Sequence, residues 1–436
     1  MSAIEITALF FGSMLFCLGM GVPIAIALGG LAAFLIFFFW GPNALSMMVL
    51  KAFGATSSFE FLSIPLFVFM AALLERSGIA EDLYETMYRF FGRLRGGLAV
   101  GTVVICTIFA AMAGVSAAAT VSMGLLALPA MLSRGYSKGL ALGCIAAGGS
   151  LGILIPPSVT MIVYGLVAGV SVGKLYAGGV LPGLLLSALF ISYILLRSRL
   201  DPTAAPAAPV REEFSWRDRL VSLRGLIFPI LLVFSVLGSI LTGFSSVSEA
   251  AAVGALGSIV ATLFRRGLNW RVFQDAAETT LLVTCLIFWI IIGASAFSTL
   301  YTAMGVSGLI KDSILGLGAN RYVILLMMQV VLLVLGCVMD TVGIIMITVP
   351  VFVPIVAALG FDPVWFGVLF IINMEIGFLT PPFGYNLFYL KGVAPPSVTM
   401  ADLYLSIIPF VVLMILGLLI CIVFPDIILY LPRLLF

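Results

Sequence analysis

The sequence has little charge, because only 9% of its 436 residues are Asp, Glu, Lys or Arg, whereas soluble domains contain about a quarter. It has no histidine, and its six cysteines are scattered singly, without a CxxC pair. This composition excludes a soluble fold and gives no reason to expect a disulfide or a zinc site. The net charge of +2 is too small and too dispersed for a nucleic-acid surface, and no GxxxxGK[ST] phosphate loop is present.

Hydrophobic residues make up 63% of the chain and form long continuous runs. Each run is long enough to cross a hydrocarbon core of ~30 Å as a helix, and the alternating pattern of a membrane barrel is missing. We therefore expect an all-α polytopic membrane protein in a lipid bilayer. No basic region precedes the first run, so we expect it to stay as a span and not to be cleaved. The main runs cover 4–20, 21–39, 98–112, 181–196, 281–297, 322–339 and 407–424.

The chain matches itself at an offset of 225 residues. Pro156-Pro157 aligns with Pro381-Pro382, and Gly152 aligns with Gly377. Because Gly and Pro mark backbone geometry, the match predicts two structural repeats, residues 1–199 and 225–436, joined by a polar cytoplasmic linker at 200–224. In each repeat we expect a re-entrant helical hairpin followed by a broken helix. These lie at about 97–133 and 137–168 in the first repeat, and at about 320–358 and 363–391 in the second.

The first repeat has an odd number of expected crossings, so the second repeat must be inverted. The five crossings are 4–20, 22–40, 61–76, 137–168 and 180–199. With the N-terminus outside, 16 of the 21 Lys and Arg residues fall on the inner side, as the positive-inside rule requires. We therefore expect both termini on the periplasmic side. A charged, aromatic stretch at 76–95 is typical of an amphipathic interfacial helix.

The two Pro-Pro pairs mark the positions at which helices must break, since proline lacks an N–H and clashes with the preceding turn. In lipid, a broken backbone is tolerated where it lines a cavity, and its freed carbonyls suit Na⁺ or an anionic group. A proline kink used only for packing is the alternative. Two breaks at matched positions favour the functional interpretation.

The turns of the hairpins are expected to face these breaks. The first turn, 113–120, is rich in small residues and carries the hydroxyls of Ser116 and Thr120. Its mate, 336–343, places Asp340 beside Thr341, and Thr341 aligns with Ser116. A carboxylate between apolar helices costs at least ~2.5 kcal/mol, so a partner such as Na⁺ is expected for Asp340. A helix-capping role near a wet cavity is the alternative.

Two further carboxylates, Glu249 and Glu375, lie within apolar segments. Each has two open interpretations, because it can pair with a partner subunit or with a neighbouring helix. A channel would require a continuous polar stripe, which the sequence does not show.

The motifs at 148–158, 340–354 and 376–384 resemble those of the large membrane subunit of TRAP transporters, the tripartite ATP-independent periplasmic systems of the ion transporter superfamily. The resemblance covers essentially the whole chain. It implies an inner-membrane symporter of a prokaryote, driven by a Na⁺ gradient and working by an elevator motion, without enzymatic activity or an organic cofactor. It also implies two partners, namely a small four-helix membrane subunit on a separate chain and a periplasmic substrate-binding protein. The cargo would be an organic acid such as a C4-dicarboxylate or sialic acid.

The resemblance also implies site residues. One Na⁺ site would join Ser116 to the first break, and the other would join the second turn to the second break. The first site would use Ser116, Gly149, Ile153 and Pro156, and the second Asp340, Thr341, Gly377, Thr380 and Pro381. The substrate would lie near Ser116, Ser150 and Asn373. No arginine falls at the breaks, so helix N-termini and hydroxyls would hold a carboxylate. A stand-alone carboxylate carrier or an ion antiporter of the same superfamily is the alternative.

Overall fold

The computed structural model describes residues 3–92, 94–206, 215–265, 267–316 and 318–436, and within these ranges the regular structure is entirely helical. The expected all-α fold is confirmed. Among the described residues, seven helices are long and apolar enough to cross a membrane, and a bent pair of shorter helices brings the number to eight. Two of the seven, Ser116–Ser133 and Thr341–Ala358, are arms of the expected hairpins. The other hairpin arms and the segments of the broken helices have 17 residues or fewer, less than the about 20 residues of a full span.

The order of helices repeats along the chain at the same offset as the Gly and Pro matches. The first repeat contains a hairpin, α6 and α7, and a broken helix, α8 and α9, before the long helix α10. Their bounds are α6 Gly97–Ala113, α7 Ser116–Ser133, α8 Lys138–Ser150, α9 Val159–Ala168 and α10 Val172–Leu200. The second repeat has α16 Arg321–Gly336, α17 Thr341–Ala358, α18 Pro363–Leu379, α19 Tyr385–Val393 and α20 Met400–Val423. Side-chain caps fix several of these starts, for example Ser137 at α8 and Asp362 at α18.

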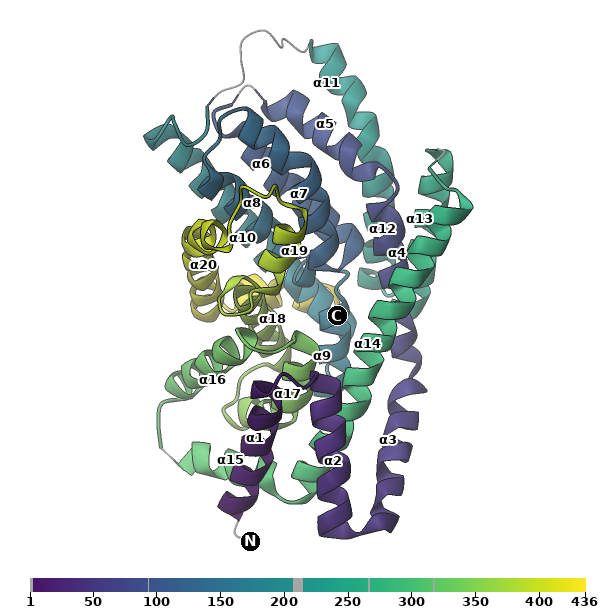
Figure 1. The fold of residues 1–436 in the computed structure, drawn as a ribbon, viewed down its shortest axis with the longest axis vertical. Coiled ribbons are helices and arrows are strands. Elements are labelled where there is room, and N and C mark those ends of the chain that lie inside the picture. Colours follow the sequence, from purple (N-terminus) through teal and green to yellow (C-terminus); the bar gives the residue numbers. More distant parts are fainter. Residues whose placement is uncertain (1–2, 93, 207–214, 266, 317) are drawn as a thin grey trace.

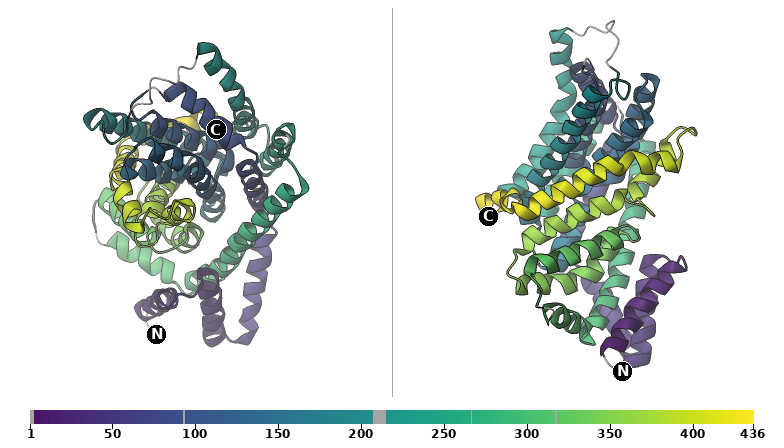
Figure 2. Two further views of the ribbon diagram at one scale, coloured as in Figure 1. Left: turned by 45° about the horizontal axis from the view of Figure 1, so that its top comes forward. Right: turned by 90° about the vertical axis from the view of Figure 1, so that its left-hand side faces the viewer.

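The helices outside the hairpins and broken helices form a tall frame beside them, except the last one, which packs on α10. These are α1 Ala3–Gly19, α2 Ile24–Trp40, α3 Ser46–Thr56, α4 Ser63–Glu75, α5 Ile79–Phe91, α11 Trp216–Ser222, α12 Ile227–Leu241, α13 Val247–Phe264, α14 Trp270–Ala303, α15 Val306–Gly316 and α21 Asp426–Leu435. In Figure 1 the frame helices α4, α13 and α14 run along one side of the molecule, and the hairpins and broken helices stack along the other. The N-terminus lies at one end of the long axis, and the C-terminus lies near its middle (Figures 1 and 2).

Helices of each repeat pack against helices of the other repeat. In the frame, α2 packs on α14 and α13 packs on α4. Gly293 approaches Gly29 so closely that a Cβ on Gly293 would lie 2.5 Å from the Ala25 carbonyl oxygen. In the core of the molecule, α7 packs on α19 and α17 packs on α9. Each broken helix is therefore covered in part by the hairpin of the other repeat.

Three boundaries differ from those expected from the sequence. The expected span at 61–76 is the second half of a bent pair, because α3 precedes it at an angle of 55°. The expected interfacial helix at 76–95 is the shorter α5, since Gly78 at its start has a left-handed φ of 74°. The expected span at 180–199 begins earlier, at Val172, where Ser171 caps α10.

The polar linker expected at 200–224 is not irregular throughout. Residues 216–222 form α11, because Ser215 and Asp218 make a reciprocal capping box. The backbone N–H of Ser137 donates to the Ala204 carbonyl, 2.9 Å away, and ties the start of the linker to the turn before α8. Residues 207–214 of this linker lie outside the described residues.

Segments assigned to the cytoplasmic side contact one another. Arg265, after α13, forms an ion pair with Asp82 of α5. Arg134, after α7, donates to the Tyr88 hydroxyl at 2.9 Å, and Lys138 lies 3.6 Å from the Asp402 carboxylate. These contacts place the basic segments close together. The distribution of Lys and Arg predicts this, because it assigns these segments to the same side of the membrane. The side that they face is a prediction.

Candidate functional site

The first hairpin turn lies directly against the first break. Gly114 ends α6 with a left-handed φ of 67°, and a Cβ on it would lie 2.3 Å from the Pro157 carbonyl oxygen. A Cβ on Gly152 would lie 3.0 Å from the backbone of Val115 and 3.1 Å from the Cα of Ser116. Both approaches are made by backbone atoms, so only glycine allows the turn and the break to meet. The turn that carries Ser116 therefore lies directly against the first break.

A buried polar bridge holds this turn in place. The Thr120 hydroxyl donates to the Ser116 carbonyl at 3.0 Å and to Asn386 Oδ1 at 2.9 Å. Asn386 Nδ2 in turn donates to the Ala146 carbonyl at 2.8 Å. A Cβ on Gly149 would lie 1.9 Å from Thr120 Oγ1, so this glycine makes room for the bridge. Asn386 belongs to α19 of the second repeat, and it therefore joins α7 and α8 of the first.

The second turn meets the second break in the corresponding way. A Cβ on Gly377 would lie 2.8 Å from both the Cα and the carbonyl carbon of Gly336. Beyond the break, the Phe383 N–H donates to the Cys337 carbonyl at 3.2 Å. The Thr380 hydroxyl donates to the Ile376 carbonyl at 2.7 Å, and Thr380 itself ends α18 in an extended conformation. The second turn and the second break are therefore also in direct contact.

Asp340 caps the second arm of this hairpin. One of its carboxylate oxygens accepts a hydrogen bond from the Val342 N–H at 2.9 Å, so the capping role expected as an alternative is present. The adjacent Thr341 hydroxyl is buried and has no hydrogen-bond partner among the described residues. Tyr385 and Tyr389 of α19 lie within electrostatic range of the Asp340 carboxylate. This capping bond uses only part of the hydrogen-bonding capacity of the Asp340 carboxylate, because a carboxylate can accept several hydrogen bonds.

The two breaks differ in exposure. Residues 151–158 of the first break are all buried, and the Tyr176 hydroxyl of α10 donates to the Ser158 carbonyl at 3.2 Å. In the second break Pro381, Pro382 and Phe383 are exposed, and the side chain of Phe383 is 45% exposed. In this conformation the second break is open at the surface and the first is enclosed.

The residues expected to contact substrate, Ser116, Ser150 and Asn373, are buried, and the last two make hydrogen bonds within the protein. The Ser150 hydroxyl donates to the Ala147 carbonyl at 2.9 Å. Asn373 Nδ2 donates to the carbonyl and to the side-chain oxygen of Gln329 on α16, at 2.8 and 2.7 Å. Asn373 Oδ1 and Gln329 Nε2 have no partner among the described residues. Sequence reasoning missed Gln329 and Asn386, although an amide side chain within an apolar helix is itself a signal of a buried polar contact.

The two other carboxylates have different surroundings. Glu249 belongs to a capping box at the start of α13, where its carboxylate accepts from the Ser246 N–H at 2.7 Å. This contact lies at the start of Glu249's own helix, so it matches neither of the two interpretations, a partner subunit or a neighbouring helix. Glu375 of α18 is fully buried, and neither of its carboxylate oxygens has a partner among the described residues.

Paired hairpins, paired helix breaks and a frame of long apolar helices define a polytopic membrane transporter. The YdaH transporter of Alcanivorax borkumensis, a solved structure, aligns with a TM-score of 0.61 at 17% identity, over 88% of this chain and 89% of that one. At this identity the likeness supports the fold alone.

The family follows from the sequence comparisons. Residues 11–427 match the model of the DctM component of tripartite ATP-independent periplasmic transporters, and the chain belongs to this family. It is 33% identical to the C4-dicarboxylate TRAP transporter large permease protein DctM of Vibrio cholerae, over 98% of both chains. It is also 33% identical to the isethionate TRAP transporter permease protein DctMQ of Oleidesulfovibrio alaskensis, over 96% of this chain and 65% of that protein. The resemblance read from the motifs is thus confirmed.

Proposed function

We propose that this chain is the large permease subunit of a Na⁺-coupled importer of an organic acid. The observation that carries the proposal is the close approach of each hairpin turn to its own helix break, at Gly114 and Gly152 in one repeat and at Gly336 and Gly377 in the other. Two such junctions, each formed where a turn meets the end of a broken helix, are suited to hold a hard cation and an anionic cargo side by side.

The second junction supplies oxygen ligands for Na⁺. Asp340 provides a carboxylate, and Thr341 provides a buried hydroxyl without another partner. The end of α18 adds the carbonyls near Gly377 and Thr380. Hard cations take carboxylate, hydroxyl and carbonyl oxygens, so this group fits Na⁺. At the first junction, the carbonyls of Gly149, Ile153 and Pro156 and the hydroxyl of Ser116 form the corresponding set.

The cargo enters from the side of the second break, which is exposed in this conformation. Movement of the hairpins and broken helices relative to the frame of α2, α4, α13 and α14 would then carry the cargo across the inner membrane in an elevator motion. The basic segments face the cytoplasm in this proposal, and both termini face the periplasm.

The partners follow from the tripartite system to which the family belongs. A periplasmic binding protein would deliver the substrate, and a small membrane subunit would complete the permease. The cargo is an acid of the type that the relatives' names indicate, a C4-dicarboxylate or a similar anion.

The Asp340→Asn variant tests the proposal. Asn caps helices about as well as Asp, so the protein should stay folded while Na⁺-dependent uptake is lost. Asp362→Asn is the matched control, because Asp362 caps α18 in the same way, accepting from Val364 N–H at 2.7 Å, and lies away from both junctions. Uptake is measured in proteoliposomes with the binding protein and the small subunit. Undiminished Na⁺-dependent uptake by Asp340→Asn would overturn the site assignment.

A further inference from the structure

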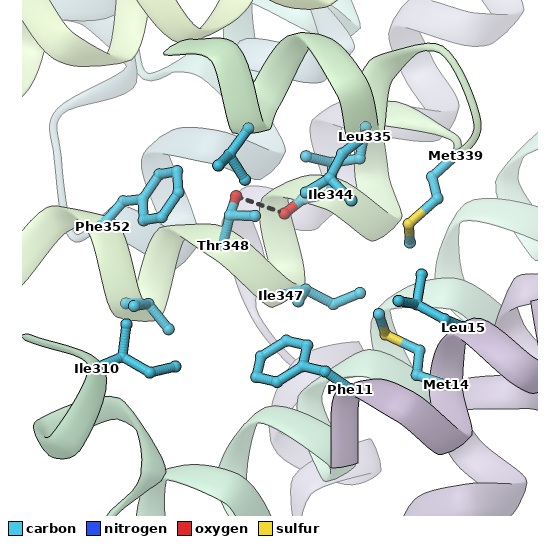
Figure 3. Close-up of a pocket in the computed structure, with 12 residues that line it drawn as sticks. Phe11, Met14, Leu15, Ile310, Leu335, Met339, Ile344, Ile347, Thr348 and Phe352 are labelled. Atoms are coloured by element: carbon cyan, nitrogen blue, oxygen red, sulfur yellow. Dashed lines mark hydrogen bonds between the residues drawn. The ribbon is translucent and has the colours of Figure 1, made fainter. Parts of the chain in front are cut away.

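An apolar cavity of about 280 Å³ lies between the N-terminal helix and the second hairpin, and Leu335 and Met339, on either side of the turn at Gly336, belong to its lining (Figure 3). Phe11, Met14 and Leu15 of α1 form one wall. The opposite wall is formed by α16 and α17, and Ile310 of α15 closes one end.

The lining offers nothing to a polar ligand. Its one polar side chain is Thr348, and the Thr348 hydroxyl is already used, because it donates to the Ile344 carbonyl at 2.7 Å (Figure 3). A cavity of ~150 Å³ lined only by apolar side chains stays dry and accepts apolar molecules, and this one is larger. Water and the anionic cargo are therefore excluded as occupants.

The cavity opens toward the lipid-facing surface. Leu15 and Val331, at its edge, are 53% and 46% exposed, whereas Ile344 and Ile347, on its inner wall, are 0% and 3% exposed. Both edge residues lie within apolar helices, so the surrounding medium at the mouth is hydrocarbon. The surface that leads inward is therefore continuous with the surface that contacts lipid tails.

We propose that this cavity binds one acyl chain of a membrane phospholipid, held between α1 and the hairpin of α16 and α17. In a bilayer, lipid tails are as apolar as leucine, so removal from water supplies no driving force. The gain comes from filling the void, since side chains that line an empty cavity lose their dispersion contacts on one side. The bound chain joins α1 to a hairpin with which α1 has few direct contacts, as α1 packs mainly on α2 and α15.

Filling the cavity with side chains tests the proposal. The double variant Val331→Phe and Val351→Phe places two rings in the cavity, because both valines line it. The matched control is Val330→Phe and Val334→Phe, two lipid-facing positions of α16 that are 53% and 59% exposed. After purification with palmitoyl-oleoyl-phosphatidylethanolamine, native mass spectrometry counts the phospholipids bound per chain.

We expect the wild type and the control to retain one phospholipid more than the filled variant. Equal retention by the filled variant, or replacement of the lipid in the wild type by detergent alone, would contradict the proposal.

A second measurement serves if the filled variant does not fold. In Phe352→Trp, the new indole replaces a cavity side chain that is only 8% exposed. Phospholipids with brominated acyl chains quench tryptophan on contact, and we expect them to quench the added fluorescence. Native Trp289, which is 66% exposed, is the positive control. Quenching of Trp289 without quenching of the added tryptophan would show that no chain enters.

Discussion

The contact between Gly336 and Gly377 allows the most direct calculation. In Gly377→Ala the new Cβ would lie 2.8 Å from the Cα and the carbonyl carbon of Gly336, whereas carbon atoms in contact lie about 3.5–4.0 Å apart. No side-chain rotation relieves this overlap, because both atoms belong to the backbone. The turn must move away from the end of α18 by roughly 0.7–1 Å, at a cost of about 1–3 kcal/mol.

That displacement separates the turn bearing Asp340 from the carbonyls at the end of α18. If the cost falls on the Na⁺-bound state, 1–3 kcal/mol corresponds to roughly a 5–150-fold loss of Na⁺ affinity. We therefore expect the Na⁺ concentration for half-maximal uptake to rise at least ~5-fold in Gly377→Ala. Gly336→Ala should have a smaller effect, since its Cβ would lie 3.2 Å from the Gly377 Cα.

The assay is Na⁺-dependent uptake in proteoliposomes, together with thermal unfolding of each variant. Gly392→Ala of α19 is the control, because a Cβ there meets nothing within 4 Å. Alanine favours a helix over glycine by about 0.8–1.0 kcal/mol, so this control should be as stable as the wild type or slightly more so. The same Na⁺ dependence in Gly377→Ala and Gly392→Ala would refute the reasoning.

Two further predictions concern the bridge and the topology. Asn386→Leu removes the hydrogen bonds to the Thr120 hydroxyl and to the Ala146 carbonyl, each worth about 0.5–1.5 kcal/mol, so the variant should melt at a lower temperature than Asn43→Leu at an exposed site. An unchanged melting temperature would contradict a structural role for the bridge. In a cysteine-free background, a cysteine introduced by Thr203→Cys should react with an impermeant maleimide only from the cytoplasm, and one introduced by Ala319→Cys only from the periplasm. Labelling of both from one side would contradict the inverted arrangement.

Local rules of backbone geometry explain which parts of the fold were readable in the sequence. The paired prolines locate both breaks, since they leave the backbone few alternatives, and the left-handed Gly135 and Gly360, which match at the same offset, follow the second arm of each hairpin. Capping residues such as Asp340 then fix where the following helices begin. These signals are local, and they can be recognised even in a chain that is 63% hydrophobic, where the positions of apolar residues say little about where helices begin and end.

The features that were missed depend on other kinds of signal. Helix α3 was overlooked because Lys51 and the polar stretch near Ser57 interrupt the apolar pattern. Helix α11 was assigned to the linker because its charged residues suggested an aqueous loop, although Ser215 and Asp218 form a capping box. The Asn386 bridge spans 240 and 266 residues of sequence, and such a contact is set by packing between the repeats.

The same distinction applies to the site. The pairing of each turn with its own break was expected from the motifs, whereas the difference in exposure between the two breaks depends on how α10 covers the first. Glu375 illustrates the limit most clearly, because its sequence position allowed a neighbouring helix as partner and its carboxylate has none among the described residues.

The central claim is that this subunit imports an organic acid by coupling to Na⁺ and by receiving cargo from a binding protein. The most direct test is uptake of a radiolabelled C4-dicarboxylate into proteoliposomes that contain both membrane subunits, with the Na⁺ gradient and the binding protein supplied separately and together. The account predicts accumulation only when both are present. Accumulation of free substrate without the binding protein, or at the same rate without a Na⁺ gradient, would contradict it.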